Sequence, residues 1–163
     1  MNPTFALTAG DPAGIGPEIA VKCLSDLDTI STCRLVVVGD ADQLRRTATT
    51  LRLPLPQSVQ MWDGRSALEG AGPFLVDLGA PPGECPQGTP SAVSGQAAMA
   101  AIRKAVSLAW ERKVNGIITG PISKKAIHLG GMGATGHTEI LARLTEFPCV
   151  PWPPCLPGGS PSC

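Results

Sequence analysis

The chain has 163 residues with 13 basic and 13 acidic side chains, so its formal net charge is zero. This length is sufficient for one domain with a hydrophobic core. The balanced charge argues against a nucleic-acid partner or an electrostatically bound membrane surface. No apolar stretch reaches the roughly 18 residues of a membrane span, and residues 1–10 lack the pattern of a signal peptide. We therefore expect a cytoplasmic protein.

Six cysteines are present, but their spacing does not indicate a disulfide scaffold or a structural metal. No C-x-x-C pair occurs, which excludes the usual zinc-knuckle and thioredoxin motifs. We expect scattered free thiols, as is usual in the cytosol.

The first half of the chain alternates short apolar runs with helical patterns. Residues 5–8 predict a buried strand, which leads through the glycine-rich segment 10–18 into a helix ending near Ser25. Pro17 suits the first turn of that helix and Glu18 suits its positive end. A second strand is expected at 35–38, followed by a helix to about Leu51 that begins with a capping box formed by Asp40 and Gln43.

The second half continues the alternation. Strands are predicted at 59–62 and 74–78, and the Pro- and Gly-rich residues 79–90 predict a loop. From Ser91 a long helix is expected, because small apolar residues recur at helical spacing: Ala98, Ile102, Ala105 and Ala109. A strand at 116–119 and helices at 123–129 and 137–145 complete the pattern. The fold class is therefore α/β, layered, with a mainly parallel sheet.

Residues 147–163 have a different composition from the rest of the chain. Six of these 17 residues are proline, three are cysteine and none is charged. We interpret residues 1–146 as a truncated N-terminal portion of a fold, and 147–163 as a disordered tail produced by a frameshift or a misjoined gene model. A genuine proline-rich extension is the alternative. The DNA beyond codon 147, read in all three frames, distinguishes them.

The glycine-rich segment 10–18, GDPAGIGPE, matches neither the P-loop pattern nor the G-x-G-x-x-G fingerprint. Its three glycines permit close approach to the backbone, and the helix that follows favours an anion at its start. A tight structural turn explains the segment equally well. Asp11 and Gly14 are nevertheless candidate site residues.

Two further segments carry candidate chemistry. In GPISKK, at 120–125, Lys124 or Lys125 can meet a phosphate or carboxylate, although Ser123 can instead simply cap a helix. In GHTE, at 136–139, His137 lies beside Thr138, which we expect to cap the helix. The imidazole can donate a hydrogen bond to a substrate, act as an acid or base, or bind a metal. His128 lies within an apolar helical pattern, and we interpret it as structural.

Four segments in order resemble the 4-hydroxythreonine-4-phosphate dehydrogenase family of vitamin B6 biosynthesis. They are TAGDPAGIGPE, GTPSAVSGQAA, ITGPISKKAIHLGG and TGHTEILARLT, and the resemblance runs from about Thr4 to Glu146. It implies a fold like that of isocitrate and isopropylmalate dehydrogenases, and a homodimer. It also implies NAD-dependent oxidation of a small phosphorylated hydroxy amino acid, 4-phosphohydroxy-threonine, followed by decarboxylation, with a divalent metal (Zn, Mg or Co).

By this resemblance, His137 and Thr138 bind substrate, with Asp11, Gly14 and Lys124 as possible supporting residues; no catalytic residue is assigned. The family's chain is about twice as long, and its three metal-binding histidines lie beyond GHTE. This chain has only two histidines, so we expect no metal site in it and no turnover. The alternatives are a non-catalytic pseudoenzyme that binds a phosphorylated ligand, and a relative that acts on another phosphorylated hydroxy acid.

Overall fold

The computed structural model describes residues 2–53, 55, 58–70, 72–133 and 136–146. The tail predicted at 147–163 lies outside the described residues.

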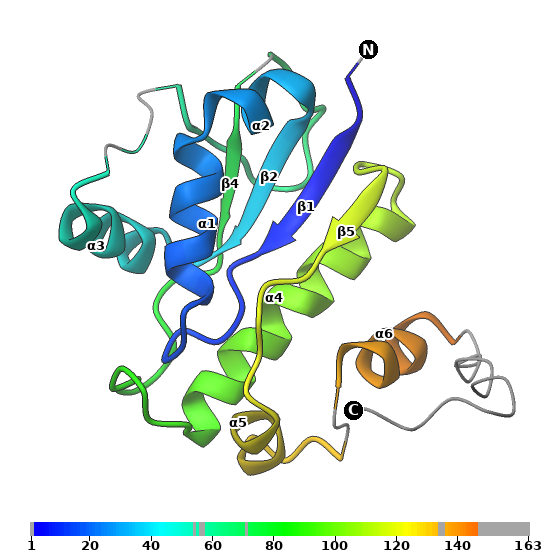
Figure 1. The fold of residues 1–163 in the computed structure, drawn as a ribbon. Coiled ribbons are helices and arrows are strands. Elements are labelled where there is room, and N and C mark those ends of the chain that lie inside the picture. The colour runs from blue at the N-terminus through cyan, green and yellow to red at the C-terminus, as the bar shows by residue number, and fades with distance from the viewer. Residues whose placement is uncertain (1, 54, 56–57, 71, 134–135, 147–163) are drawn as a thin grey trace, which may run out of the picture.

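The centre of the molecule is a five-stranded parallel sheet with the order β3-β4-β2-β1-β5 (Figure 1). This order confirms the expected α/β class. Every predicted strand is present, with ends within two residues of the prediction. The strands are β1 (Thr4–Thr8), β2 (Arg34–Gly39), β3 (Gln60–Met61), β4 (Phe74–Asp77) and β5 (Gly116–Ile118).

Five of the six described helices were predicted. The exception is α2, a short helix with no buried residue, which begins at the side-chain cap that Asp26 provides to the Thr29 N–H. The helices are α1 (Gly16–Ser25), α2 (Leu27–Thr32), α3 (Ala41–Leu51), α4 (Ala92–Trp110), α5 (Lys124–Leu129) and α6 (His137–Thr145).

The two faces of the sheet are covered by different helices. Alternate residues of each strand point to opposite faces and so pack against different helices. In β2, Leu35 and Val37 pack with α1 and α3, whereas Val36 and Val38 pack with α4. A third apolar cluster joins α4, α5 and α6 through Ile102 of α4, Ile127 of α5 and Ile140 of α6. The helices that carry the GPISKK and GHTE motifs are therefore anchored on α4.

Three local predictions need correction. Asp40 caps α3 as expected, but the Gln43 side chain does not complete the capping box: its Nε2 donates to the Pro12 carbonyl, at 2.7 Å. Gly136, and not Thr138, is the N-cap residue of α6. His128, which we interpreted as structural from its apolar helical pattern, is exposed on α5.

Candidate functional site

The candidate site is built where β1 and β5 end side by side. Leu7 of β1 is paired with Ile118 of β5, and the pairing continues when the Gly120 N–H donates to the Thr8 carbonyl, at 3.1 Å. Beyond this point β1 leads into the glycine-rich segment and β5 leads into GPISKK. Since the strands are parallel, both segments emerge at the carboxyl edge of the sheet, where open α/β folds bind their ligands.

The two segments touch through their backbones. The Asp11 N–H donates to the Pro121 carbonyl, at 2.9 Å. Gly10 has a φ of +76°, and a Cβ at this position would lie 2.4 Å from the Pro121 oxygen. Such an approach requires glycine, because both the left-handed backbone and the missing side chain are needed. Gly10 is thus explained by the junction with Pro121.

The Asp11 side chain is buried and fixes the turn that follows it. Its Oδ1 accepts a hydrogen bond from the Ala13 N–H, at 2.8 Å, and its main-chain carbonyl accepts from the Gly14 N–H, at 3.0 Å. Asp11 and Gly14 therefore lie together in one hydrogen-bonded turn. This gives both residues a structural role, and their ligand-binding role stays a prediction.

The segment before α4 closes over the same turn. The Gln87 side chain donates to the Gly14 carbonyl, at 2.9 Å, and the Gly88 N–H donates to the Ala13 carbonyl, at 2.7 Å. At the other side, Gly95 of α4 lies against the Ala126 carbonyl of α5. The segment that begins at Gly88 therefore bridges the glycine-rich turn and the helix carrying the lysines.

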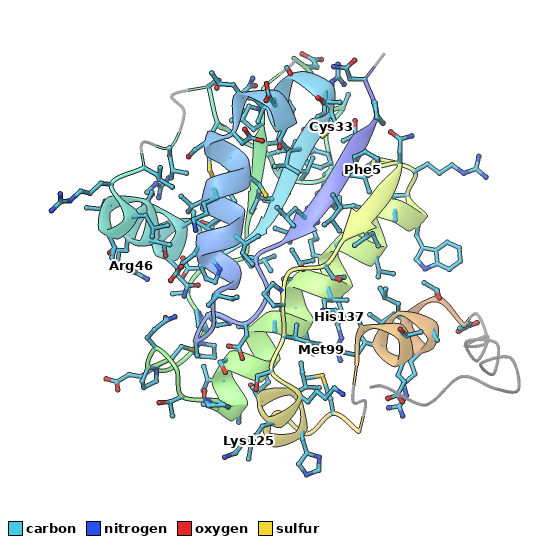
Figure 2. The ribbon with its side chains drawn as sticks, in the orientation of Figure 1. Phe5, Cys33, Arg46, Met99, Lys125 and His137 are labelled. Atoms are coloured by element: carbon cyan, nitrogen blue, oxygen red, sulfur yellow. The ribbon has the colours of Figure 1, made fainter. Side chains whose placement is uncertain are left out.

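His137 joins the fourth motif to this assembly. It is half-buried at the first turn of α6, and its Nε2 lies 3.0 Å from the Gly120 carbonyl oxygen. Figure 2 shows His137 on the side of α6 that faces the rest of the fold. Gly120 thus contacts Thr8 through its nitrogen and His137 through its oxygen.

The remaining candidates lie at the edge of this arrangement. Thr138 follows His137 and is exposed. Lys124 and Lys125 begin α5 and are also exposed, while Ser123 caps that helix by accepting from the Ala126 N–H. Lys125 points away from His137 (Figure 2). The structure therefore joins His137 to Gly120 and joins Asp11, which forms one turn with Gly14, to the adjacent Pro121, whereas Lys124 lies on the exposed start of α5.

A cavity of about 260 Å³ opens beside the site, at the carboxyl ends of β1, β2 and β4. Small side chains and glycine backbone form most of its wall, and its polar groups include Asp40, Gln43 and Gln96. The sequence indicated Asp40 only as a helix cap. Its position directly after a buried parallel strand could have indicated a second role, because ligands bind at the carboxyl ends of such strands.

No group of three or more His, Cys, Asp or Glu side chains in the described part of the chain could hold a metal ion. Cys23, Cys33 and Cys85 are free thiols. Burial raises the pKa of the Cys85 thiol, and the nearby carboxylates of Asp11 and Asp40 raise it further. Cys85 is therefore a neutral thiol near neutral pH and not an activated nucleophile. Among the described helices, none has the length and apolar character needed to cross a membrane.

Comparisons with known proteins agree on one family. The family model described as pyridoxal phosphate biosynthetic protein PdxA matches residues 31–151. A D-threonate 4-phosphate dehydrogenase of Cupriavidus necator is 37% identical over 148 residues, which are 91% of this chain and 44% of that protein. A 4-hydroxythreonine-4-phosphate dehydrogenase of Trichlorobacter lovleyi is 37% identical over 88% of this chain and 43% of that protein.

Solved structures give the same result. The crystal structure of a 4-hydroxythreonine-4-phosphate dehydrogenase from Burkholderia phymatum matches with a TM-score of 0.77 and 37% identity, over 90% of this chain and 44% of that one. A terephthalate 1,2-cis-dihydrodiol dehydrogenase from Burkholderia xenovorans matches with a TM-score of 0.70 and 30% identity. The chain thus spans less than half the length of the relatives it matches. Because the family model covers more than half of the sequence and the solved structures share its fold, the chain belongs to the PdxA family.

Proposed function

We propose that this chain forms one part of the substrate site of a 4-hydroxythreonine-4-phosphate dehydrogenase, and that it binds a small phosphorylated hydroxy acid there. In the complete enzyme this ligand would be 4-phosphohydroxy-threonine. Its hydroxyl would be oxidised with NAD as the acceptor, and the resulting keto acid would lose carbon dioxide. His137 and Thr138 are the proposed ligand-binding residues, supported by Asp11, Gly14 and Lys124.

The observation that carries this proposal is the convergence on Gly120. Motifs more than a hundred residues apart, at Thr8 and His137, are hydrogen-bonded to the two sides of one buried glycine. An imidazole held at the carboxyl edge of a parallel sheet, next to a turn of glycines, suits a small polar ligand.

The names of the relatives support D-threonate 4-phosphate as a second candidate substrate. The Cupriavidus protein is named for D-threonate 4-phosphate, and the Trichlorobacter protein for 4-hydroxythreonine 4-phosphate, at the same 37% identity. Both ligands are small phosphorylated hydroxy acids. The alternative of a non-catalytic protein that binds such a ligand uses the same residues, and differs only in lacking turnover.

The described residues fit the two implied cofactors differently. The cavity near Asp40 has walls of small residues that leave room for part of NAD, although the Asp40 carboxylate itself already caps α3. A divalent metal, in contrast, has no group of three or more ligands in the described residues. We propose that the chain alone therefore gives no metal-dependent oxidation. A homodimer and a cytoplasmic location complete the proposal.

Binding and turnover test the proposal separately. We expect 4-phosphohydroxy-L-threonine and D-threonate 4-phosphate to bind the purified chain in isothermal titration calorimetry, and the variant His137→Ala to weaken binding about tenfold. His128→Ala is the matched control, because this histidine is exposed on α5. Equal affinities in the two variants would contradict the proposed site.

Turnover is followed as NADH absorbance with substrate, NAD and a divalent metal. No NADH is expected from this chain. Clear metal-dependent NADH formation would show that the 163 residues are sufficient for catalysis, and the proposal of a partial site would then be wrong.

A further inference from the structure

The site contains a buried threonine, the first residue of the segment TAGDPAGIGPE, to which no ligand-binding role is assigned above. Thr8 is the last residue of β1 and is 1% exposed. Its Oγ1 accepts a hydrogen bond from the Gly120 N–H, at 2.9 Å, and its main-chain carbonyl accepts from the same N–H, at 3.1 Å. Two acceptors on one donor hold the nitrogen of Gly120 more firmly than the sheet pairing alone.

Gly120 is also fixed by its surroundings. A Cβ at this position would lie 2.3 Å from the Thr8 carbonyl oxygen and 3.0 Å from the Gly10 nitrogen. Glycine is therefore required, and there is little free space into which this residue can move. Its carbonyl, in consequence, points at His137 from a fixed position.

The Gly120 carbonyl determines the protonation pattern of the His137 ring. A carbonyl oxygen only accepts, so the Nε2 at 3.0 Å must carry the hydrogen. In the neutral imidazole, Nδ1 is then the acceptor nitrogen. Such an acceptor suits the hydroxyl of a hydroxy acid, whereas a phosphate oxygen would require a protonated ring.

We infer that Thr8 is a positioning residue for the site: its hydroxyl fixes Gly120, and Gly120 holds His137 as the Nε2–H tautomer that presents Nδ1 as acceptor. The ligand part of this inference rests on the proposed function. The tautomer and its dependence on Thr8 do not, because both are properties of the free protein.

The test uses the chain labelled with ¹⁵N-histidine, whose only two histidines are His128 and His137. We expect the His137 Nε2–H proton to be protected from solvent exchange and visible in ¹H–¹⁵N spectra, while exposed His128 shows no such signal. Thr8→Val removes the hydroxyl at nearly constant volume, and we expect faster Nε2–H exchange. Thr8→Ser retains the hydroxyl and should restore protection. Circular dichroism verifies that each variant is folded.

Rapid exchange of His137 in the unaltered chain, or an Nδ1–H tautomer, would overturn the inference. So would unchanged protection in folded Thr8→Val. If Thr8→Val does not fold, the unaltered chain and Thr8→Ser still test it, because loss of protection in Thr8→Ser contradicts a role for the hydroxyl. With D-threonate 4-phosphate as probe, Thr8→Val should lose about three- to tenfold in affinity. Protection without any binding of this probe would instead refute the proposed function alone.

Discussion

At the scale of single residues, the contact between Gly10 and Pro121 shows that the geometry of the site requires a particular amino acid. The glycine-rich turn meets GPISKK through backbone atoms, and neither backbone can retreat, since Asp11 is hydrogen-bonded to the same carbonyl. A methyl group on Gly10 must therefore displace main chain and not a flexible side chain.

We predict that Gly10→Ala destabilises the chain clearly more than Gly79→Ala. The two glycines have nearly the same backbone, with φ of +76° and +72°, but a Cβ on Gly79 would have nothing within 4 Å. Gly79→Ala should therefore lower the unfolding free energy by about 1–2 kcal/mol, the cost of placing alanine in a left-handed backbone. Gly10→Ala should lower it by that amount and also by the cost of the steric clash with Pro121. Urea denaturation measures both. Equal losses of unfolding free energy would show that the junction yields easily.

A second prediction concerns pH and Asp63. Its carboxylate accepts from the backbone N–H groups of Arg65 and Ser66, at 2.8 and 2.9 Å, and these hydrogen bonds lower its pKa to about 2. An unfolded aspartate has a pKa of about 3.9. Since the folded value is the lower one, the stabilisation is complete above pH 4 and is lost as the pH falls towards 2.

Asp63→Asn tests this pH dependence, because asparagine can keep the turn but does not titrate. We expect the variant to lose less of its unfolding free energy than the parent chain between pH 4 and pH 2. Unfolding curves at several pH values measure the difference. Parallel pH profiles for the two proteins would rule out a contribution from Asp63.

At the scale of elements, α4 and α5 pack directly against each other. A Cβ on Gly95 would lie 2.0 Å from the Ala126 carbonyl oxygen, so the two helices touch without a side chain between them. Replacing glycine by alanine inside a helix ordinarily stabilises it by roughly 0.5–1 kcal/mol. At Gly95 the contact with Ala126 should instead make the replacement destabilising.

We therefore predict that Gly95→Ala lowers the unfolding free energy, by about 1–3 kcal/mol, as overpacked cores do. Gln96→Ala is the control, because Gln96 is the next residue of α4 and is exposed. It should change stability by less than about 0.5 kcal/mol. A Gly95→Ala chain as stable as the parent would mean that α5 moves away without cost.

The elements also show what could be predicted from the sequence. Apolar runs such as 35–38 predict their strands well, because parallel strands are buried on both faces. Helix α2 was missed because it buries no residue and so has no apolar periodicity. Gln43 fits a capping box locally, but the Pro12 carbonyl competes for its side chain from 31 residues away.

Prediction of the site was limited in the same way. His137 stands out in the sequence because of its neighbours Gly136 and Thr138. Thr8 and Gly120 do not, since their importance lies in a contact between strand ends separated by 112 residues. Side-chain type indicates the residue that we propose to face the ligand, whereas the residues inferred to hold it in place depend on strand order.

At the scale of the whole molecule, β5 lies at one edge of the sheet formed by the described residues. In the described part of the chain β5 is paired with β1 alone, and Ile118 is 46% exposed although its strand reads as a buried apolar run. An unpaired apolar strand edge favours pairing with another chain. The chain covers about 44% of the matched relatives.

We predict that the chain self-associates through β5 and that Ile118→Lys reduces this association, because edge lysines oppose strand pairing. Size-exclusion chromatography with light scattering measures the mass over a range of concentrations. Leu27→Lys is the control, since Leu27 is 74% exposed but lies on α2, outside the sheet. If both lysine variants lower the mass equally, general surface hydrophobicity causes the association. A parent chain that stays monomeric at every concentration would contradict the prediction.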